Sequence, residues 1–207
     1  MRLIDVLRST WKRPPPERRS PTALSMTQIE ERIRSWGAGS FAMADVVDST
    51  ALLNELGPRE YGVQVGAFRQ RASTIAESAG GFLVDATGDA ILALFEGLAK
   101  AISFAEQLTS DSGAPSFALR IAVHHERPVS DLRDSLTVAT MLAPEIPYVA
   151  RILSALKEPG IGISDSAHKQ LIASGITGLK VGTPSEHEFK GFPGRHMVWR
   201  VARWPDA

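Results

Sequence analysis

The sequence predicts an α+β fold in which a ferredoxin-like antiparallel sheet carries helices on one face. Strand and helix patterns alternate beyond residue 40, in the order strand, long helix, two strands, helix, strand, helix, strand. Two apolar runs, GFLVDA and AILALF, flank the short connection 87–89 and predict a β-hairpin. A length of 207 residues with 43% hydrophobic content suits one core of this size and an appendage.

Each element follows from a local pattern. Residues 41–47 predict a buried strand, and residues 51–79 have the apolar spacing of a long helix that Gly57-Pro58 interrupts near its start. After the hairpin, the same criteria predict helices over 98–108, 148–156 and 168–173, and strands over 117–124, 160–164, 179–182, 186–190 and 196–202.

The N-terminal segment differs from the rest in charge and proline content. Residues 1–36 carry eight Lys or Arg against four Asp or Glu, so this segment is four units positive and, for a chain of zero net charge, the remainder is four units negative. Residues 12–21 hold four prolines and predict an extended linker, which precedes a short helix capped by Thr27. We therefore divide the chain into a basic, proline-containing arm with a short helix (1–37) and a folded domain (38–204). The arm is either a disordered tail or a weak docking element for an acidic membrane surface or a partner protein.

Composition excludes several classes of function. The balanced charge argues against a nucleic-acid coat protein, which needs excess cations to displace phosphate counterions. The absence of cysteine excludes disulfide scaffolds, zinc ribbons and thiol catalysis. No apolar run approaches the roughly 18 residues that span a bilayer, and the start lacks the apolar core of about 7–15 residues of a signal peptide. A cytoplasmic protein is the expectation.

Two aspartates stand at positions where chemistry is plausible. Asp45 interrupts an apolar strand, and Asp89 lies in the hairpin turn. A buried carboxylate is costly unless it is hydrogen-bonded or bound to a cation, and carboxylates on adjacent strands suit Mg²⁺ or Mn²⁺. Taken separately, each aspartate is better explained as a turn or capping residue, and spacing alone does not establish a metal site. Asp48, just before the long helix, is equally well explained as its N-cap.

Six segments in order resemble the motifs of the class III adenylyl and guanylyl cyclase catalytic domains, with this chain as a divergent member. FAMADVVDST resembles the first metal motif, F-x-D-I-x-G-S/F-T, and VDATGDAILALF resembles the hairpin motif, K/E-x-x-G-D-x-x-x-x-x-F. The later motifs of the family are matched by LRIAVH, VARILSAL, GIGISDSA and EFKGFPGRHMVWRV. The resemblance covers residues 41–201 and implies the class III nucleotidyl cyclase fold, with conversion of a nucleoside triphosphate to a 3′,5′-cyclic mononucleotide and pyrophosphate.

The resemblance assigns roles to individual residues. Asp45, Asp89 and the backbone carbonyl of Val46 match the ligands of two divalent cations, Mg²⁺ or Mn²⁺, that serve in-line displacement at phosphorus. Arg151 matches the catalytic arginine that stabilises charge on the α-phosphate. The implied substrate-binding positions are Asp85, Thr140, Ser49, Thr50 and Lys190.

Asp85 stands where adenylyl cyclases have a base-selecting lysine and guanylyl cyclases a glutamate. Its carboxylate can accept hydrogen bonds from guanine, which favours a purine with these donors. Thr140 lies near the second base-selecting position in a segment, 127–143, that departs strongly from the family. A pyrimidine nucleotide therefore remains an alternative substrate.

Two departures affect catalysis. Pro147 replaces the transition-state asparagine and offers neither a side-chain amide nor a backbone N–H. Asp48 replaces the glycine of the turn next to the triphosphate. Because the family builds its site between two protomers, the leading expectation is a head-to-tail homodimer with two sites. The alternatives are a catalytically silent domain that binds nucleotide or a partner protein, and a heterodimer whose second chain supplies the asparagine.

Overall fold

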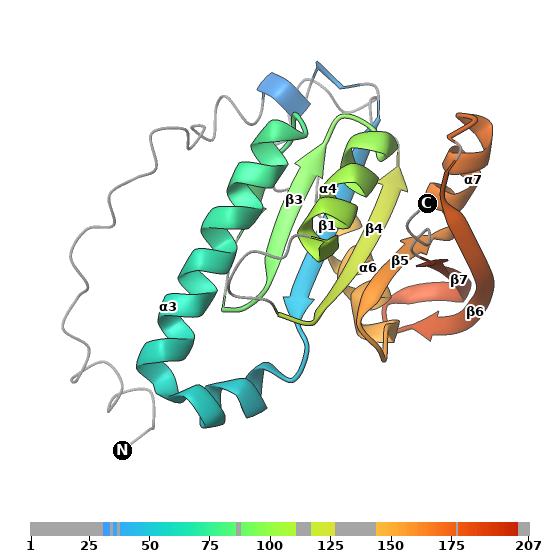
Figure 1. Cartoon of the computed structure of the whole chain (residues 1–207). Helices are drawn as coiled ribbons and strands as arrows, with labels where there is room; N and C mark the ends of the chain where they lie inside the picture. Colours follow the sequence, from blue (N-terminus) through green and yellow to red (C-terminus); the bar gives the residue numbers. More distant parts are fainter. Residues whose placement is uncertain are drawn as a thin grey trace.

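The computed structural model describes residues 31–33, 35–36, 38–85, 88–110, 117–126, 144–176 and 178–202 (Figure 1). Strands and helices alternate along the chain as the apolar periodicity predicts. They are β1 Gly39–Val46, α3 Ser49–Ser78, β2 Phe82–Asp85, β3 Ile91–Phe95, α4 Leu98–Ser110, β4 Leu119–Glu126, α6 Glu145–Ala155, β5 Gly160–Ser164, α7 Asp165–Ala173, β6 Lys180–Phe189 and β7 Phe192–Ala202.

The strands form one seven-stranded sheet in the order β2-β3-β1-β4-β5-β7-β6. All neighbours are antiparallel except β4 and β5, which are parallel. Strand β1 lies between β3 and β4, and its register places Asp45 directly opposite Arg120. The sheet thus brings the end of β1, the β2–β3 turn and the start of β4 close together, at one end of its central strands.

Helices α3, α4 and α7 cover one face of the sheet, where the larger of the two cores lies. Successive residues of a strand point to opposite faces, so Ala42 and Ala44 of β1 face this core. The fully buried rings of Phe68, Phe95 and Phe104 fill the space between the helices and the strands. Burial of these aromatic rings removes large apolar surfaces from water and stabilises this face.

Helix α6 covers the other face and lies behind the sheet in Figure 1. The intervening strand residues, among them Phe41 and Leu92, form a second core with Val149 and Ile152 of α6. The predicted α+β fold is confirmed, but the expectation that the helices share one face is wrong for α6. Apolar side chains occupy both faces of β1 and β3, and α6 buries the second set, which would otherwise be exposed to water.

The end of the predicted N-terminal helix contributes to this second core. Ile33 and Trp36 are 3% and 8% exposed, and the Trp36 ring lies 5.7 Å from that of Phe82, centroid to centroid. Residues 1–30 lie outside the described residues, as does Gly37. The division at residue 37 therefore stays a prediction, although two side chains before it pack on the domain.

Two irregularities have clear causes. Gly57 has φ 77° and ψ 159°, so α3 is kinked at the Gly57-Pro58 pair, as the sequence predicts. Strand β6 continues through Pro184, where two separate strands were expected, because it is an edge strand and tolerates the missing N–H donor. Among the described residues, no helix has the length and apolar content to cross a bilayer.

Candidate functional site

A depression of about 660 Å³ lies where the end of β1, the start of α3, the β2–β3 turn and the start of β4 meet. Three carboxylates, those of Asp45, Asp48 and Asp89, line it together with the guanidinium of Arg120. The formal charge of this lining is three negative against one positive. The neutral part of the lining consists of Val46, Ser49, Thr50, Ala51, Asn54 and Ala90.

Asp45 and Arg120 form a two-pronged ion pair in this depression. Arg120 donates from Nε to Asp45 Oδ1 at 3.0 Å and from Nη2 to Oδ2 at 2.7 Å. The side chain of Asp45 is only 22% exposed and that of Arg120 only 27%. The hydrogen bonds to Asp45 raise the pKa of Arg120, burial opposes them, and the charges of Asp45, Asp48 and Asp89 add to the rise. Arg120 is thus the cation to which all three carboxylates are electrostatically coupled.

Asp48 adopts the left-handed backbone conformation, with φ 53° and ψ 34°, at the position where the related motif has glycine. Asp tolerates this conformation better than most residues, which accounts for the substitution. Its side chain makes no capping hydrogen bond to α3, so it is not the N-cap ligand that its position suggests. The first amides of α3, at Ser49 and Thr50, therefore border the depression without a side-chain acceptor from Asp48.

Asp89 is placed by side chains of α3. Arg69 donates from Nη2 to the carbonyl of Gly88, which anchors the β2–β3 turn to the helix. Burial raises the pKa of Tyr61, and the charge of Asp89 raises it further, while a hydrogen bond with Ser49 and the charge of Arg69 lower it. Tyr61 is therefore within electrostatic range of Asp89 and hydrogen-bonded to Ser49, the first residue of α3.

The donor set fits Mg²⁺ or Mn²⁺ only in part. Carboxylate and carbonyl oxygens are the ligands these ions prefer, and they commonly take one or two carboxylates with substrate phosphates. Among the described residues, however, no group of three or more His, Asp or Glu side chains is arranged to hold a metal ion alone. Asp45 also has both oxygens on Arg120. Asp45 is therefore available to a cation only where Arg120 is displaced from it.

Arg151 and Pro147 lie apart from these carboxylates, on the exposed side of α6. Their spacing of four residues puts them on one stripe of the helix, opposite the buried Val149 and Ile152. Within the described part of the chain, no hydrogen bond or ion pair holds the Arg151 guanidinium. The carbonyl of Leu156, the residue after α6, accepts from Arg120 Nη1 at 3.4 Å and so links the end of this helix to a side chain of the depression.

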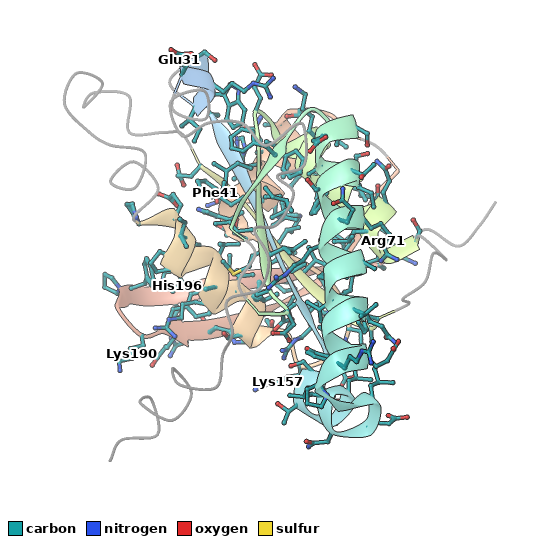
Figure 2. All side chains as sticks on the ribbon, turned by 90° about the vertical axis from the view of Figure 1, so that its left-hand side faces the viewer. Glu31, Phe41, Arg71, Lys157, Lys190 and His196 are labelled. Carbon is teal, nitrogen blue, oxygen red and sulfur yellow. The ribbon has the colours of Figure 1, made fainter. Side chains whose placement is uncertain are left out.

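Of the remaining predicted positions, the structure describes only the side chain of Lys190. Asp85 is the last residue of β2, and its side chain lies outside the described part of the structure. Thr140 also lies outside the described residues. Lys190 is exposed in the β6–β7 turn, and Figure 2 shows it far from helix α3. Three strands separate β1 from β6 in the sheet.

Sequence reasoning missed two polar side chains of β4. The first, Arg120, lies in the depression. The second, His124, is 3% exposed and contacts Ser164 Oγ through Nδ1 at 2.9 Å and Glu145 Oε2 through Nε2 at 2.8 Å. The only available signal was their alternation along LRIAVH, since residues 120 and 124 share one face of a strand. Their partners lie 21 to 75 positions away and leave no local pattern.

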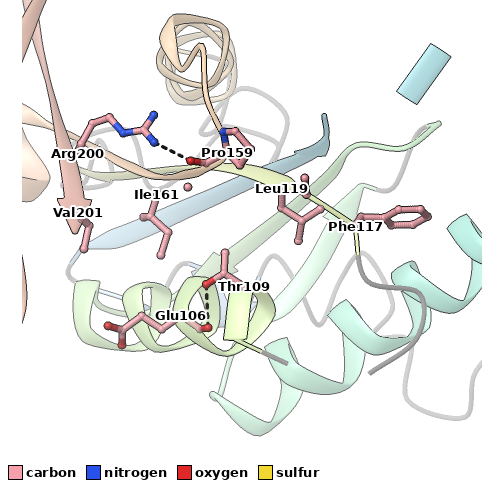
Figure 3. A pocket seen from close by; sticks show the side chains of 10 residues that line it. Glu106, Thr109, Phe117, Leu119, Pro159, Ile161, Arg200 and Val201 are labelled. Carbon is pink, nitrogen blue, oxygen red and sulfur yellow. Dashed lines mark hydrogen bonds between the residues drawn. The ribbon is translucent and has the colours of Figure 1, made fainter. Parts of the chain in front are cut away.

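A second cavity, of about 360 Å³, lies between α4, β4, β5 and β7 (Figure 3). Its lining is mainly apolar, including Leu119 and Ile161, with Glu106 and Arg200 as its charged side chains. Burial raises the pKa of Glu106. Arg200 donates to the carbonyls of Glu158 and Pro159 at 3.1 and 2.6 Å. None of the predicted site residues lines this cavity.

The fold is that of the catalytic domains of adenylyl and guanylyl cyclases. The adenylyl cyclase CyaB from P. aeruginosa superposes with a TM-score of 0.64 at 15% identity, over 81% of this chain and 95% of that one. The guanylate cyclase domain of RhGC from Catenaria anguillulae, in complex with GTP, superposes with a TM-score of 0.60 at 19% identity, over 81% and 97%. Adenylate cyclases from Trypanosoma brucei in their monomeric state give 0.62 at 13%, over 80% and 89%.

Comparison of the sequence with family models and with curated proteins finds no match. At 13–19% identity the solved structures establish the fold, and the chemistry has to be argued from the residues.

Proposed function

We propose that this chain is a nucleotidyl cyclase that converts a nucleoside triphosphate to a 3′,5′-cyclic mononucleotide and pyrophosphate. One observation carries the proposal: Asp45, Asp48, Asp89 and Arg120 line one depression beside the first amides of α3, in a cyclase fold. Helix N-termini and arginine bind phosphate oxygens, and paired carboxylates bind the divalent cations that accompany a triphosphate.

In this proposal Asp45, Asp89 and the carbonyl of Val46 hold two Mg²⁺ or Mn²⁺ ions. When bound, such ions supply a lowered pKa for the ribose 3′-hydroxyl and charge neutralisation for the phosphates. The 3′-oxygen forms a bond to the α-phosphorus, its proton leaves to solvent, and the bond between the α-phosphorus and the pyrophosphate oxygen breaks. Ser49 and Thr50, at the start of α3, bind phosphate through backbone and hydroxyl groups.

The reaction also needs a cation for the charge that develops on the α-phosphate. Arg151 is the proposed catalytic residue, and its exposure on the outer side of α6 leaves it accessible to a second chain. A head-to-tail homodimer of the domain (38–204) therefore supplies metal ligands from one protomer and Arg151 from the other, in two equivalent sites. Asp85 and Thr140 are the proposed base contacts, Lys190 is a further substrate contact, and the arm (1–37) is a docking element.

A second candidate function is a cyclase-homology domain without catalysis, which binds nucleotide or a partner protein through dimerisation. Two observations favour it. Pro147, on the same side of α6 as Arg151, provides no amide donor. In addition, Arg120 already pairs with the carboxylate of Asp45. A heterodimer, in which another chain supplies the missing amide, is the remaining variant of the proposal.

The test is turnover by the purified full chain with Mn²⁺ and each of the four ribonucleoside triphosphates. We expect one or more cyclic products by mass spectrometry, and loss of product in both Asp45→Asn and Asp89→Asn. Glu186→Gln is the matched control, because this exposed carboxylate pairs with Arg195 in the β6–β7 hairpin, outside the depression. Nucleotide binding without product favours the silent domain, and product only after a second chain is added favours the heterodimer.

A further inference from the structure

The guanidinium of Arg120 joins two parts of the chain. Its Nε and Nη2 hold both oxygens of Asp45, and its Nη1 reaches the carbonyl of Leu156 at 3.4 Å. All three nitrogens are therefore engaged at once. Leu156 directly follows α6, the helix that carries Arg151. A change at Asp45 consequently reaches the end of α6 through one side chain.

The ion pair also opposes the binding of a cation from solution. A carboxylate whose two oxygens accept from one planar guanidinium has little capacity left for a metal ion in the same plane. The pair is mostly buried, so screening by solvent is weaker than at an exposed pair. Yet Asp48 and Asp89 lie in the same depression, so a second positive charge is favoured there once Arg120 moves.

We propose that Arg120 is a positioning residue that couples cation binding at Asp45 to the C-terminal end of α6. This inference rests on the proposed function, since it assumes that Asp45 is a metal ligand. Arg120 must leave Asp45 before that carboxylate binds Mg²⁺ or Mn²⁺. When it leaves, the contact with Leu156 is lost, and the end of the helix that carries Arg151 is released. In the proposed dimer, loading of one site thus alters the helix that serves the other.

The loop 156–160 offers a control for this coupling. A second arginine, Arg200, holds the same loop through the carbonyls of Glu158 and Pro159, but it contacts no carboxylate there. Replacement of Arg200 loosens the loop and leaves Asp45 paired. Replacement of Arg120 frees both the loop and Asp45. The two variants therefore separate a mechanical effect on the loop from competition for the carboxylate.

The experiment measures Mn²⁺ binding to the full chain without nucleotide, by electron paramagnetic resonance of free Mn²⁺. We expect Arg120→Met to bind Mn²⁺ about tenfold more tightly than the wild type, because a partly buried charge-assisted pair no longer competes. Arg200→Met should stay within about twofold of the wild type, since Asp45 keeps its partner. Equal or weaker binding by Arg120→Met overturns the inference, and so does equal tightening in Arg200→Met. A purely structural arginine would not tighten metal binding when removed.

Hydrogen exchange of the wild type tests the same coupling without any substitution. Saturating Mn²⁺ should increase exchange at amides 153–158, and unchanged exchange overturns the inference even if Arg120→Met fails to fold. Failure of this coupling can be distinguished from failure of the proposed function. Tight Mn²⁺ binding and cyclic product with no Arg120 effect contradict only the coupling. Absence of Mn²⁺ binding with and without GTP contradicts both.

Discussion

The depression at the end of β1 and the outer side of α6 are built on different principles. The depression gathers four charged side chains from β1, the turn before α3, the β2–β3 turn and β4 of one chain, and all three guanidinium nitrogens of Arg120 are hydrogen-bonded. On the outer side of α6, Arg151 and Pro147 are exposed, and the described part of the chain holds no partner for Arg151. The first region is organised by its own fold. In the proposed function, the second acquires its role when another chain lies against it.

The largest effect is expected from a substitution at Pro147, the position on the outer side of α6 that lacks the amide of the related motif. Pro147→Asn restores an amide four residues before Arg151, and we expect turnover with Mn²⁺ and the accepted triphosphate to rise about tenfold or more, as for a lost transition-state donor. Ser154→Asn, an exposed position on the same helix, is the control that should leave the rate unchanged. An unchanged rate in Pro147→Asn would show that the outer side of α6 is not half of an active site.

A second substitution separates the two regions by stability. His124 is buried with both ring nitrogens bonded, and its contact with Glu145 fixes the start of α6. We expect His124→Ala to lower the free energy of unfolding by about 2–4 kcal/mol, because it leaves a partly buried carboxylate unpaired and a cavity in the core. Urea denaturation measures this loss.

Ser166→Ala is the control for His124, because its hydroxyl lies 3.3 Å from Nδ1 and makes the weaker of the two contacts there. The folded fraction of His124→Ala should keep Mn²⁺ binding at the depression and lose turnover, since only α6 is displaced. Loss of Mn²⁺ binding with turnover retained would reverse the proposed division between the regions.

The local part of this architecture was readable from the sequence, and the contacts between distant residues were not. The apolar runs of β1 and the β2–β3 hairpin, and the kink at Gly57-Pro58, follow from neighbours in the chain. Helix α6 begins at Glu145, earlier than the expected residue 148, because Glu145 pairs with His124. Helix α7 begins at Asp165, earlier than the expected residue 168, because Ser164 Oγ accepts from the amide of Ala167.

The candidate site likewise has residues that the sequence identified and a contact between distant residues that it did not. Asp45, Val46, Ser49, Thr50 and Asp89 were named from motifs, and the sheet brings them to one depression. Whether they bind metal and substrate stays a prediction. The pairing of Asp45 with Arg120 depends on strand register over 75 positions, which no local pattern encodes. The side of the sheet that α6 occupies depends likewise on the tertiary packing of two sets of apolar side chains.

A smaller effect is expected in the turn that leads into α3. Asp48→Gly should raise the free energy of unfolding by about 0.5–1 kcal/mol, because glycine adopts φ 53° without strain. Asp48→Ala removes the same carboxylate but keeps a Cβ in this conformation, so it should be less stable than Asp48→Gly. Thermal denaturation of the two variants isolates the conformational contribution, and equal stabilities would contradict it.

The smallest effect concerns the phenol of Tyr61, which reports on charge at Asp89. The chain has two tyrosines, so Tyr148→Phe leaves Tyr61 as the only phenol to titrate by absorbance. Burial, and after it the charge of Asp89, raise the pKa of Tyr61 above its ordinary value, so its midpoint of titration should lie above pH 10. Because the folded pKa is raised, the stabilising contribution is complete below pH 10 and is lost as the pH rises through the folded pKa.

Asp89→Asn in the same background should lower the pKa of Tyr61, because the neighbouring charge is gone. Glu186→Gln, in the distant hairpin, should not change it. A Tyr61 pKa that does not respond to Asp89→Asn would contradict the placement of Tyr61 beside the Asp89 turn.

The proposed function rests on the claim that one active site takes its metal ligands from one chain and Arg151 from another. Its most direct test mixes two inactive variants, Asp45→Asn and Arg151→Met, and measures cyclic nucleotide formation with Mn²⁺. We expect no product from either variant alone. The mixture should regain about a quarter of wild-type activity, since half of the dimers are mixed and one of the two sites in each mixed dimer is intact. A wild-type chain that is active, with a mixture that stays inactive after subunit exchange, would contradict the claim.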